Sequence, residues 1–242
     1  MPRHHLPPAL LEAATRNYRF AGRFAWQFAR GKLRIDPAFA GLLAGGWVAP
    51  KARVLDLGCG QGLLASLLLA VDEAVSQGAW PAAWGAAPVG CTVRGIELMP
   101  KDVQRAQTAL AAHTGRVTVE QGDITRAAFS ASDAVVILDV LHYMPFAAQQ
   151  SVLEKAHACL VPGGRLLLRV GDKAAGLPHR LSNWVDKVVF IVRGHASSAL
   201  YCRSVAEWQT LLAQVGFASD VHPMHAGTPF ASTLFVAEKL PR

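Results

Sequence analysis

The sequence predicts a doubly wound α/β fold, with a mostly parallel sheet of seven strands and an antiparallel C-terminal strand. Three observations predict it. From residue 53 onward, short β-type runs alternate with helical runs, as they do in βαβ units. The run 133–140 is almost wholly apolar, which is typical of a parallel strand buried on both faces. The last two β-type runs are separated by a short connection that fits a hairpin.

The elements follow one another in a regular order. The predicted strands are 53–58, 91–97, 116–123, 133–140, 165–170, 217–223 and 230–239. The predicted helices between them are 61–76, 100–113, 145–160 and 204–217. Pro100 suits the first turn of its helix, and Gly216 suits the position just after a helix end.

The N-terminal region precedes this alternation. Residues 1–10 contain three prolines and indicate a loose arm. Residues 11–35 indicate a single helix, because Phe20, Phe24 and Phe28 recur every four residues and arginines follow a helical spacing on another face.

We expect residues 1–48 to form a helical cap and residues 49–242 to form the main domain. Two segments interrupt the main domain. Residues 77–90 form a loop rich in Gly, Ala and Pro that also holds two tryptophans. Residues 171–203 include a further helical run, and long insertions of this kind are commonly lids. The second insertion is therefore predicted to be a substrate lid.

The bulk composition, 52% hydrophobic, allows a sizeable core. The longest apolar run, 63–71, is far shorter than the roughly 18 residues that a membrane-spanning helix needs, and no signal-peptide pattern is visible. A cytoplasmic location is expected. The four cysteines lack CxxC spacing, so neither a metal site nor a disulfide framework is indicated. The net charge of +7 leaves nucleic acid, an anionic membrane and an acidic substrate open.

A glycine-rich turn, VLDLGCGQG at 54–62, follows the first strand. Open α/β sheets bind ligands beyond the carboxyl ends of their strands, and glycines there let backbone amides approach a ligand. No GK[ST] follows, which excludes a P-loop. The glycines are Gly58, Gly60 and Gly62, and Leu63 stands where a dinucleotide fingerprint has its third glycine. The turn alone therefore predicts a ligand-binding site but does not indicate which ligand binds there.

Chemically suitable side chains stand at the ends of the next three strands. Glu97 ends the second strand, where a carboxylate can accept hydrogen bonds from both hydroxyls of a ribose. Asp123 ends the third strand, where it can accept from the exocyclic amine of adenine. Asp139 and His142 follow the fourth strand, near the place of a transferred group. Each acid could instead cap a helix or face solvent, but their occurrence at consecutive strand ends favours one shared ligand.

With these features the sequence resembles the class I S-adenosylmethionine-dependent methyltransferases over about residues 50–240. VLDLGCGQG resembles the first motif of that family, GIELMP the second, VEQGDI the third and AVVILDVLHYM the fourth. LVPGGRLLLRV is similar to the fifth-strand motif of small-molecule members, and RSVAEWQTLLAQVGF is similar to their C-terminal helix. The resemblance implies a Rossmann-like fold, methyltransferase activity and S-adenosyl-L-methionine as the cofactor.

The resemblance also implies which residues bind that cofactor. They are Asp56, Gly58, Cys59, Gly60, Glu97, Leu98, Asp123, Ile124, Asp139 and Val140. Asp56, Gly58 and Gly60 would line the methionine end, with Asp139 and Val140 beside it. Glu97 would hold the ribose, Leu98 and Ile124 would enclose the adenine, and Asp123 would accept from its amine. The 35 residues from Gly62 to Glu97 exceed the usual interval, so the ribose assignment depends on the loop at 77–90 being an insertion.

Transfer of a methyl group from a sulfonium is an in-line displacement, which an enzyme promotes mainly by aligning donor and acceptor. An acceptor hydroxyl must also lose its proton, which a nearby histidine can take. His142 is the first candidate for this base, and His195 in the insertion is the second. His142 could instead only line the pocket or pack. Tyr143 could orient the substrate or pack.

Aromatic residues of the N-terminal helix and the insertion suggest the wall of an apolar acceptor pocket. Tyr18, Phe24 and Trp184 are the candidates, with core packing as the alternative for each. We expect O-methylation of a small lipophilic, phenolic or acyl acceptor in a biosynthetic pathway. The segment AGRFAWQFARGKLR is similar to methyltransferases of bacterial aryl-polyene-type pathways. Because the same helix is basic and amphipathic, contact with an anionic membrane is an alternative role for it.

Other functions stay open at this point. A non-catalytic partner in a biosynthetic complex would keep the same cofactor-binding residues. Nucleic acid is not expected as a partner, because DVLHYMP after the fourth strand has neither the (N/D)PP(Y/F) motif of amino-methylating DNA enzymes nor the Pro-Cys of C5 enzymes. A protein substrate is not excluded. The missing third fingerprint glycine and Asp123 argue against an NAD(P)-dependent oxidoreductase.

Overall fold

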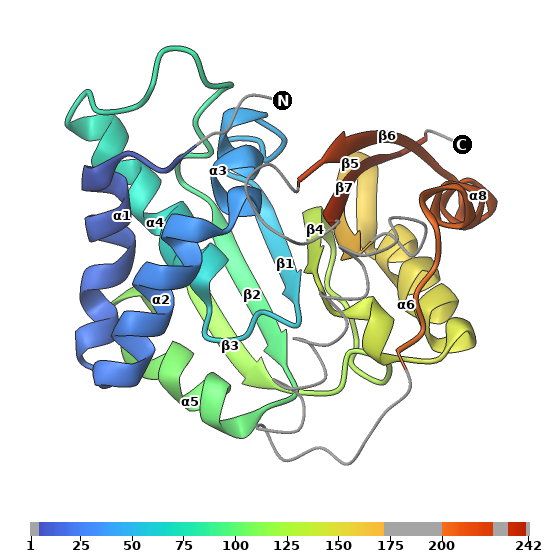
Figure 1. The fold of residues 1–242 in the computed structure, drawn as a ribbon, viewed down its shortest axis with the longest axis horizontal. Coiled ribbons are helices and arrows are strands. Elements are labelled where there is room, and N and C mark those ends of the chain that lie inside the picture. Colours follow the sequence, from blue (N-terminus) through green and yellow to red (C-terminus); the bar gives the residue numbers. More distant parts are fainter. Residues whose placement is uncertain (1–4, 172–199, 225–231, 241–242) are drawn as a thin grey trace.

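The computed structural model describes residues 5–171, 200–224 and 232–240. They form one seven-stranded sheet with the strand order β3-β2-β1-β4-β5-β7-β6 (Figure 1). The chain starts this sheet in the middle and winds outward first on one side and then on the other. The predicted Rossmann-like fold class is confirmed.

The first five strands are parallel. They are β1 Arg53–Leu57, β2 Thr92–Glu97, β3 Val117–Gln121, β4 Ser132–Leu138 and β5 Leu160–Gly171. In the middle of the sheet, Leu57 pairs with Ile96 on one side and with Ile137 on the other. These three strands therefore end together, and the residues that follow them meet at one edge of the sheet, where α/β proteins bind ligands.

Two antiparallel pairings complete the sheet. β6 Phe217–Pro223 pairs with β7 Ser232–Lys239, and β7 also runs antiparallel to β5. The pairing of Pro223 with Thr233 confirms the hairpin that the spacing predicts.

Helices cover both faces of the sheet (Figure 1). α4 Leu63–Ser76 and α5 Pro100–Ala109 pack on one face, and α6 Phe146–Cys159 and α8 Val205–Val215 pack on the other. Each face has its own cluster of buried apolar side chains. Ser204 begins α8 with a capping box, in which its hydroxyl and the Glu207 carboxylate each accept a backbone N–H of the other.

The prediction of one helix over 11–35 is wrong. The chain instead forms α1 Pro8–Thr15, a short 3-10 helix η1 Arg16–Arg19 and α2 Arg23–Ile35. Gly22 has a φ of 101°, which a glycine adopts readily and which separates η1 from α2. Pro8 takes the first helical position, where its missing N–H costs nothing. The helix therefore begins within the segment predicted as a loose arm.

The cap segment packs against the first face of the sheet. Its third helix, α3 Pro37–Ala44, begins at Asp36, whose carboxylate accepts from the Ala38 N–H at 3.0 Å. The Ser66 hydroxyl of α4 donates to the Ala14 carbonyl of α1 at 2.7 Å. Buried side chains of the cap and of α4 belong to one apolar cluster.

Residues 77–90 form an irregular loop between α4 and β2. The rings of Trp80 and Trp84 meet edge to face with centroids 5.2 Å apart. Gly85 N–H donates to the Ala44 carbonyl at 2.9 Å, and a Cβ on Gly85 would lie only 2.7 Å from the Cα of Gly46. The loop thus packs against the end of α3. The other predicted insertion falls largely on residues 172–199, outside the described residues, so its role as a lid stays a prediction.

Candidate active site

The glycine-rich turn lies between β1 and α4, with its backbone held against β2. The N–H groups of Gly58 and Cys59 both donate to the Ile96 carbonyl, at 2.8 and 3.3 Å. A Cβ on Gly58 would lie 2.4 Å from a methyl carbon of Val140, so this position needs glycine for packing. A Cβ on Gly60, where φ is 55°, would meet no heavy atom of the described residues within 4 Å. The turn is therefore packed at Gly58 and open at Gly60.

Glu97 lies directly against this open position. One carboxylate oxygen accepts the Gly60 N–H and the other accepts the Met99 N–H, both at 2.8 Å. The side chain is nearly buried, and each oxygen keeps a second lone pair. The loop at 77–90 leaves β2 paired with β1, and Glu97 at the end of β2 lies beside the glycine-rich turn, so its assignment to the ribose stays a prediction.

Asp56, the fourth residue of β1, is only 4% exposed. Burial, together with the charge of Glu97, raises the pKa of the Asp56 carboxyl to about 7. Within the part of the chain that the structure describes, no hydrogen bond reaches this carboxyl. A buried acid without a donor is costly, and a ligand that brings a cation or an N–H would relieve that cost.

The predicted adenine residues surround the ends of β2 and β3. Leu98 is 54% exposed, whereas Ile124 is buried. Asp123 is exposed, and one of its oxygens accepts from the N–H and the hydroxyl of Thr125, at 2.8 and 2.7 Å. The hydroxyl bond is the main reason that the pKa of Asp123 is lowered. Asp123 thus shapes its own turn with one oxygen, and its other oxygen is directed to no protein group within the described residues.

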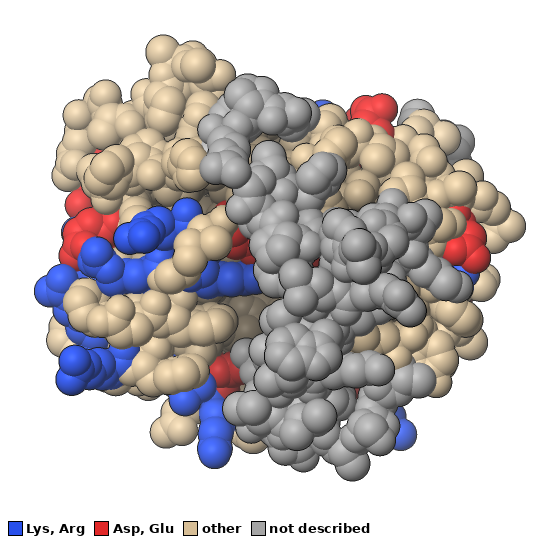
Figure 2. Space-filling model, in the orientation of Figure 1, with Lys and Arg blue, Asp and Glu red and all other residues tan. Residues whose placement is uncertain are grey.

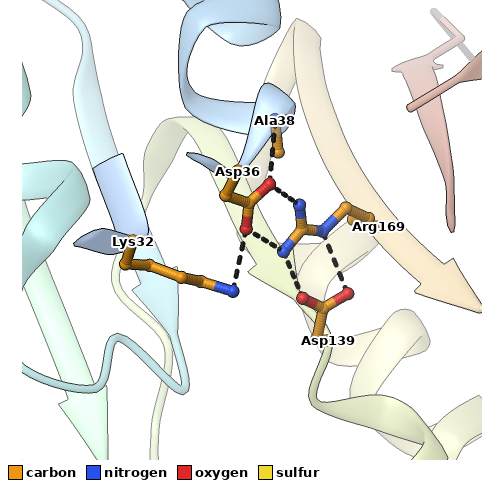
Figure 3. Close-up of polar contacts among 5 residues, drawn as sticks. All are labelled: Lys32, Asp36, Ala38, Asp139 and Arg169. Atoms are coloured by element: carbon orange, nitrogen blue, oxygen red, sulfur yellow. Dashed lines mark hydrogen bonds and ion pairs between the residues drawn. The ribbon is translucent and has the colours of Figure 1, made fainter. Parts of the chain in front are cut away.

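Asp139 follows β4 and has a φ of 59°, which is unusual for a residue other than glycine. The buried guanidinium of Arg169 on β5 pairs with it, with one N–H···O distance of 2.9 Å (Figure 3). The same guanidinium pairs with Asp36 of the cap, with one distance of 2.8 Å. Arg169 therefore bridges two carboxylates, one from the cap and one from the carboxyl edge of the sheet.

Lys32 of α2 completes this network at 2.8 Å from Asp36. Burial would raise the pKa of Asp36, but the charges of Arg169 and Lys32 hold it well below its usual range. Burial would lower the pKa of Arg169, but Asp139 and Asp36 raise it above its usual value. Asp36, Lys32 and Arg169 were not among the predicted site residues. The available signals were an arginine inside the otherwise apolar strand run RLLLRV and the Asp-Pro start of α3.

His142 lies in a short 3-10 helix, η3 Leu141–Tyr143, and is 7% exposed. Its ring and that of Tyr143 have centroids 4.1 Å apart. The His142 carbonyl accepts the Tyr201 N–H at 2.9 Å, and the Gln149 side-chain amide donates to the Tyr201 carbonyl at 2.8 Å. The segment before α8 is thereby held against η3. His195 and Trp184 lie outside the described residues.

The two predicted acceptor residues of the cap differ in their surroundings. Tyr18 is fully buried, and its hydroxyl donates to the Gln61 carbonyl of the glycine-rich turn at 2.8 Å. The structure thus places Tyr18 behind the turn. Phe24 is 63% exposed, stacks on Phe28 with centroids 6.2 Å apart and lies under the Arg105 guanidinium at 4.6 Å.

Comparisons with known proteins give one family match, and it covers most of the chain. The methyltransferase domain family matches residues 49–216. The carboxy-S-adenosyl-L-methionine synthase of Klebsiella pneumoniae is 25% identical over 191 residues, which make up 73% of this chain and 72% of that protein. The chain is similar in fold to magnesium protoporphyrin IX methyltransferase of Synechocystis PCC 6803 with bound SAH, with a TM-score of 0.57, 22% identity and 93% coverage of both chains.

A second solved structure shows the same fold. It is an O-methyltransferase family 2 protein of Planctomyces limnophilus in complex with apigenin, with a TM-score of 0.62 and 18% identity. The similarity covers 92% of this chain and 62% of that chain. The family match spans more than half of the 242 residues and includes the glycine-rich turn, Glu97, Asp123 and Asp139. The chain therefore belongs to the methyltransferase domain family of class I S-adenosylmethionine-dependent methyltransferases.

Proposed function

We propose that this methyltransferase acts on a hydroxyl of a small lipophilic acceptor, either a phenol or an acyl acid, in a biosynthetic pathway. One observation carries the proposal. The buried acid Glu97 accepts the N–H of Gly60, whose position is open at the carboxyl edge of the sheet, and the buried acid Asp56 lies near enough to Glu97 for the two charges to interact. Acids at an open glycine turn suit a ligand that combines a ribose with a cationic amino-acid tail.

S-adenosylmethionine fits these residues. Glu97 would accept the ribose hydroxyls with the lone pairs left by its two amide bonds. Leu98 supplies an exposed apolar side chain for one face of the adenine, and the free oxygen of Asp123 would accept from the adenine amine. Asp56 would receive the positive charge of the methionine end. When bound, the cofactor supplies a methyl group on a sulfonium, which is an electrophile with a good leaving group.

The protein's own part is alignment and proton removal. Asp139 is held in its left-handed conformation by the buried Arg169, which fixes the edge beside the transferred group. His142 lies three residues after Asp139 and would take the proton of the acceptor hydroxyl. Tyr143 beside it would orient the acceptor. Position and proton transfer together can account for much of such a catalyst's effect.

The flank of α2 supports a lipophilic acceptor. Phe24, Phe28 and Ile35 lie on one side of the helix, because they are separated by four and seven residues. Lys32 of the same helix reaches the Asp36–Arg169–Asp139 network. This side of α2 therefore extends from α5 towards the carboxyl edge of the sheet. Phe24 remains a candidate for the wall of the acceptor pocket.

A second candidate function comes from the sequence relatives. Proteins that share a quarter of the aligned residues over 73% of this chain are carboxy-S-adenosyl-L-methionine synthases. A reaction in which S-adenosylmethionine itself is modified is therefore the alternative to methylation of a separate acceptor.

Mass spectrometry tests both candidates. The full-length protein is incubated with S-adenosylmethionine and a panel of phenols and acyl acids, and both S-adenosylhomocysteine and methylated acceptors are measured. A methylated phenol or acid supports the proposal. A carboxylated sulfonium formed with loss of the carboxyl group from one acid of the panel, without methylated acceptor, supports the alternative. Calorimetric binding of S-adenosylmethionine with no product from either reaction would favour a non-catalytic partner.

His142→Ala should lower turnover about 10²–10⁴-fold while cofactor affinity is retained, and a loss under threefold would remove its role as base.

A further inference from the structure

The corner where η1 meets α2 exposes large apolar side chains. Phe20 is 79% exposed and Phe24 is 63% exposed, on either side of the bend at Gly22. This corner lies at the outer end of the cap, at the lower left of Figure 1. Two phenylalanines left in water forgo the burial that would normally stabilise them, and grouped apolar side chains on a surface commonly mark an interaction site.

Positive charge surrounds these two rings. Arg19 and Arg23 flank Phe20 in the sequence and are both exposed, and we call Arg19, Phe20, Arg23 and Phe24 the cap tip. Residues 8–36 contain six Lys or Arg and two acids. Figure 2 shows Lys and Arg side chains gathered over the cap side of the molecule. Among the described residues, Arg23 makes no ion pair.

The two acids of this segment do not neutralise the tip. Glu12 pairs with both Arg19 and Arg30, at 3.0 and 2.8 Å, and so balances one of two positive charges. Asp36 is engaged by Arg169 and Lys32 away from the tip. The tip therefore combines protruding aromatic rings with a net positive field.

We propose that the cap tip docks on an anionic lipid bilayer, with Phe20 and Phe24 entering the interface and the arginines contacting the headgroups. Amphipathic, basic segments with aromatic side chains bind membranes in this way. No helix within the described ranges is long and apolar enough to cross a bilayer. Both rings are highly exposed and can insert into a lipid surface. We therefore favour a bilayer as the partner, in preference to a nucleic acid on which the rings would stack.

The position of the tip gives this docking a use. Tyr18, two residues before Phe20, is hydrogen-bonded to the glycine-rich turn, and Arg105 of α5 covers the Phe24 ring. The tip therefore lies next to the carboxyl edge that holds the site. A lipophilic acceptor dissolved in the bilayer would be released beside that edge. Docking itself does not depend on the proposed reaction, because it can be measured without cofactor or acceptor.

Vesicle sedimentation tests the proposal with the full-length protein. The protein is spun with sucrose-loaded vesicles of phosphatidylcholine alone or mixed with phosphatidylglycerol, at low and high salt. We expect binding to the mixed vesicles that weakens with salt. Phe20→Ser should weaken it about tenfold through lost apolar transfer, and Arg23→Glu should weaken it about tenfold or more through lost attraction. Both positions are exposed, so folding should be retained.

Matched controls lie on other parts of the surface. Leu240→Ser removes an apolar side chain that is 52% exposed, and Lys51→Glu reverses an exposed charge. Both should bind vesicles as the unchanged protein does. The proposal is overturned if the unchanged protein ignores phosphatidylglycerol vesicles, or if tip and control variants bind alike. It is also overturned if a single-stranded oligonucleotide binds through Phe20 and the vesicles do not bind.

Discussion

The phenol of Tyr18 donates a hydrogen bond of 2.8 Å to the carbonyl of Gln61, the residue between two left-handed glycines of the glycine-rich turn. Both residues are buried, and the Gln61 side-chain amide donates to the Asp102 carboxylate at 3.2 Å. The cap segment thus fixes the turn from behind, while α5 fixes it from the side.

Tyr18→Phe should therefore destabilise the conformation of the glycine-rich turn, while the aromatic ring keeps its packing. The substitution leaves the Gln61 carbonyl buried without its donor, which costs about 1–3 kcal/mol of the free energy of unfolding. We expect S-adenosylmethionine affinity by calorimetry to fall about tenfold, because part of that cost is borne by the binding conformation.

Thr15→Val is the matched control for Tyr18→Phe. It also removes a buried hydroxyl that donates to a carbonyl of the cap segment, that of Leu11 at 2.8 Å, but both of these residues lie in α1 and not in the turn. Its loss of stability should be similar and its cofactor affinity unchanged. Equal loss of affinity in both variants would contradict a positioning role for Tyr18.

Gly60→Val should abolish cofactor binding. Gly60 has a φ of 55°, which strains a β-branched residue, and its Cβ would enter the open space at the turn. Gly78→Val is the control, because Gly78 has a φ of 67° and equally open surroundings but lies in the loop after α4. Calorimetry with S-adenosylhomocysteine should show binding to the Gly78 variant alone. Unchanged affinity of the Gly60 variant would refute the turn as the cofactor site.

Asp56 should make both stability and cofactor affinity depend on pH. Its pKa is about 7 in the folded chain and about 4 in the unfolded chain, so the folded state binds more protons between these values. The free energy of unfolding of the cofactor-free protein should therefore fall as the pH rises through that window. Urea unfolding of Asp56→Asn should lack this decrease and should show higher stability than the unchanged protein above about pH 7.

Ionisation of Asp56 should affect cofactor affinity in the opposite direction to stability. The ionised form of Asp56 attracts the positive methionine end, so affinity for S-adenosylmethionine should rise about tenfold between about pH 6 and pH 8. Binding should release protons, which calorimetry in buffers of different ionisation enthalpy detects. In Asp56→Asn the affinity should be lower and independent of pH in this range. A pH dependence that survives the substitution would assign it to another group.

Local patterns predicted the sheet and the position of the glycine-rich turn, because each strand and each turn carries its signal within a few residues. Glu97 could be placed despite the long loop before it, since its strand pattern is intact. The break at Gly22 could not be predicted, because the four-residue phenylalanine period continues through it. The bridge from Asp36 to Arg169 joins residues 133 apart, and no local pattern records such a pairing. The pKa of Asp56 depends on burial that only the packed sheet creates.

Arg169 should contribute strongly to the free energy of unfolding because, among the described residues, its guanidinium links two partly or wholly buried carboxylates. Its side chain is 4% exposed and pairs with Asp36 and Asp139 (Figure 3). Arg169→Met keeps the length and apolar character of the stem but leaves both acids without the guanidinium, which should cost about 3–5 kcal/mol in urea unfolding. Arg169→Lys should recover only part of this stability, because an ammonium cannot reproduce the planar fork of the guanidinium.

Arg53→Met is the control, since Arg53 makes an exposed pair with Asp133 and its loss should cost about 1 kcal/mol or less. Similar losses for Arg53→Met and Arg169→Met would show that the buried bridge contributes no more than a surface pair. In that case the left-handed conformation of Asp139 must be held by the turn itself.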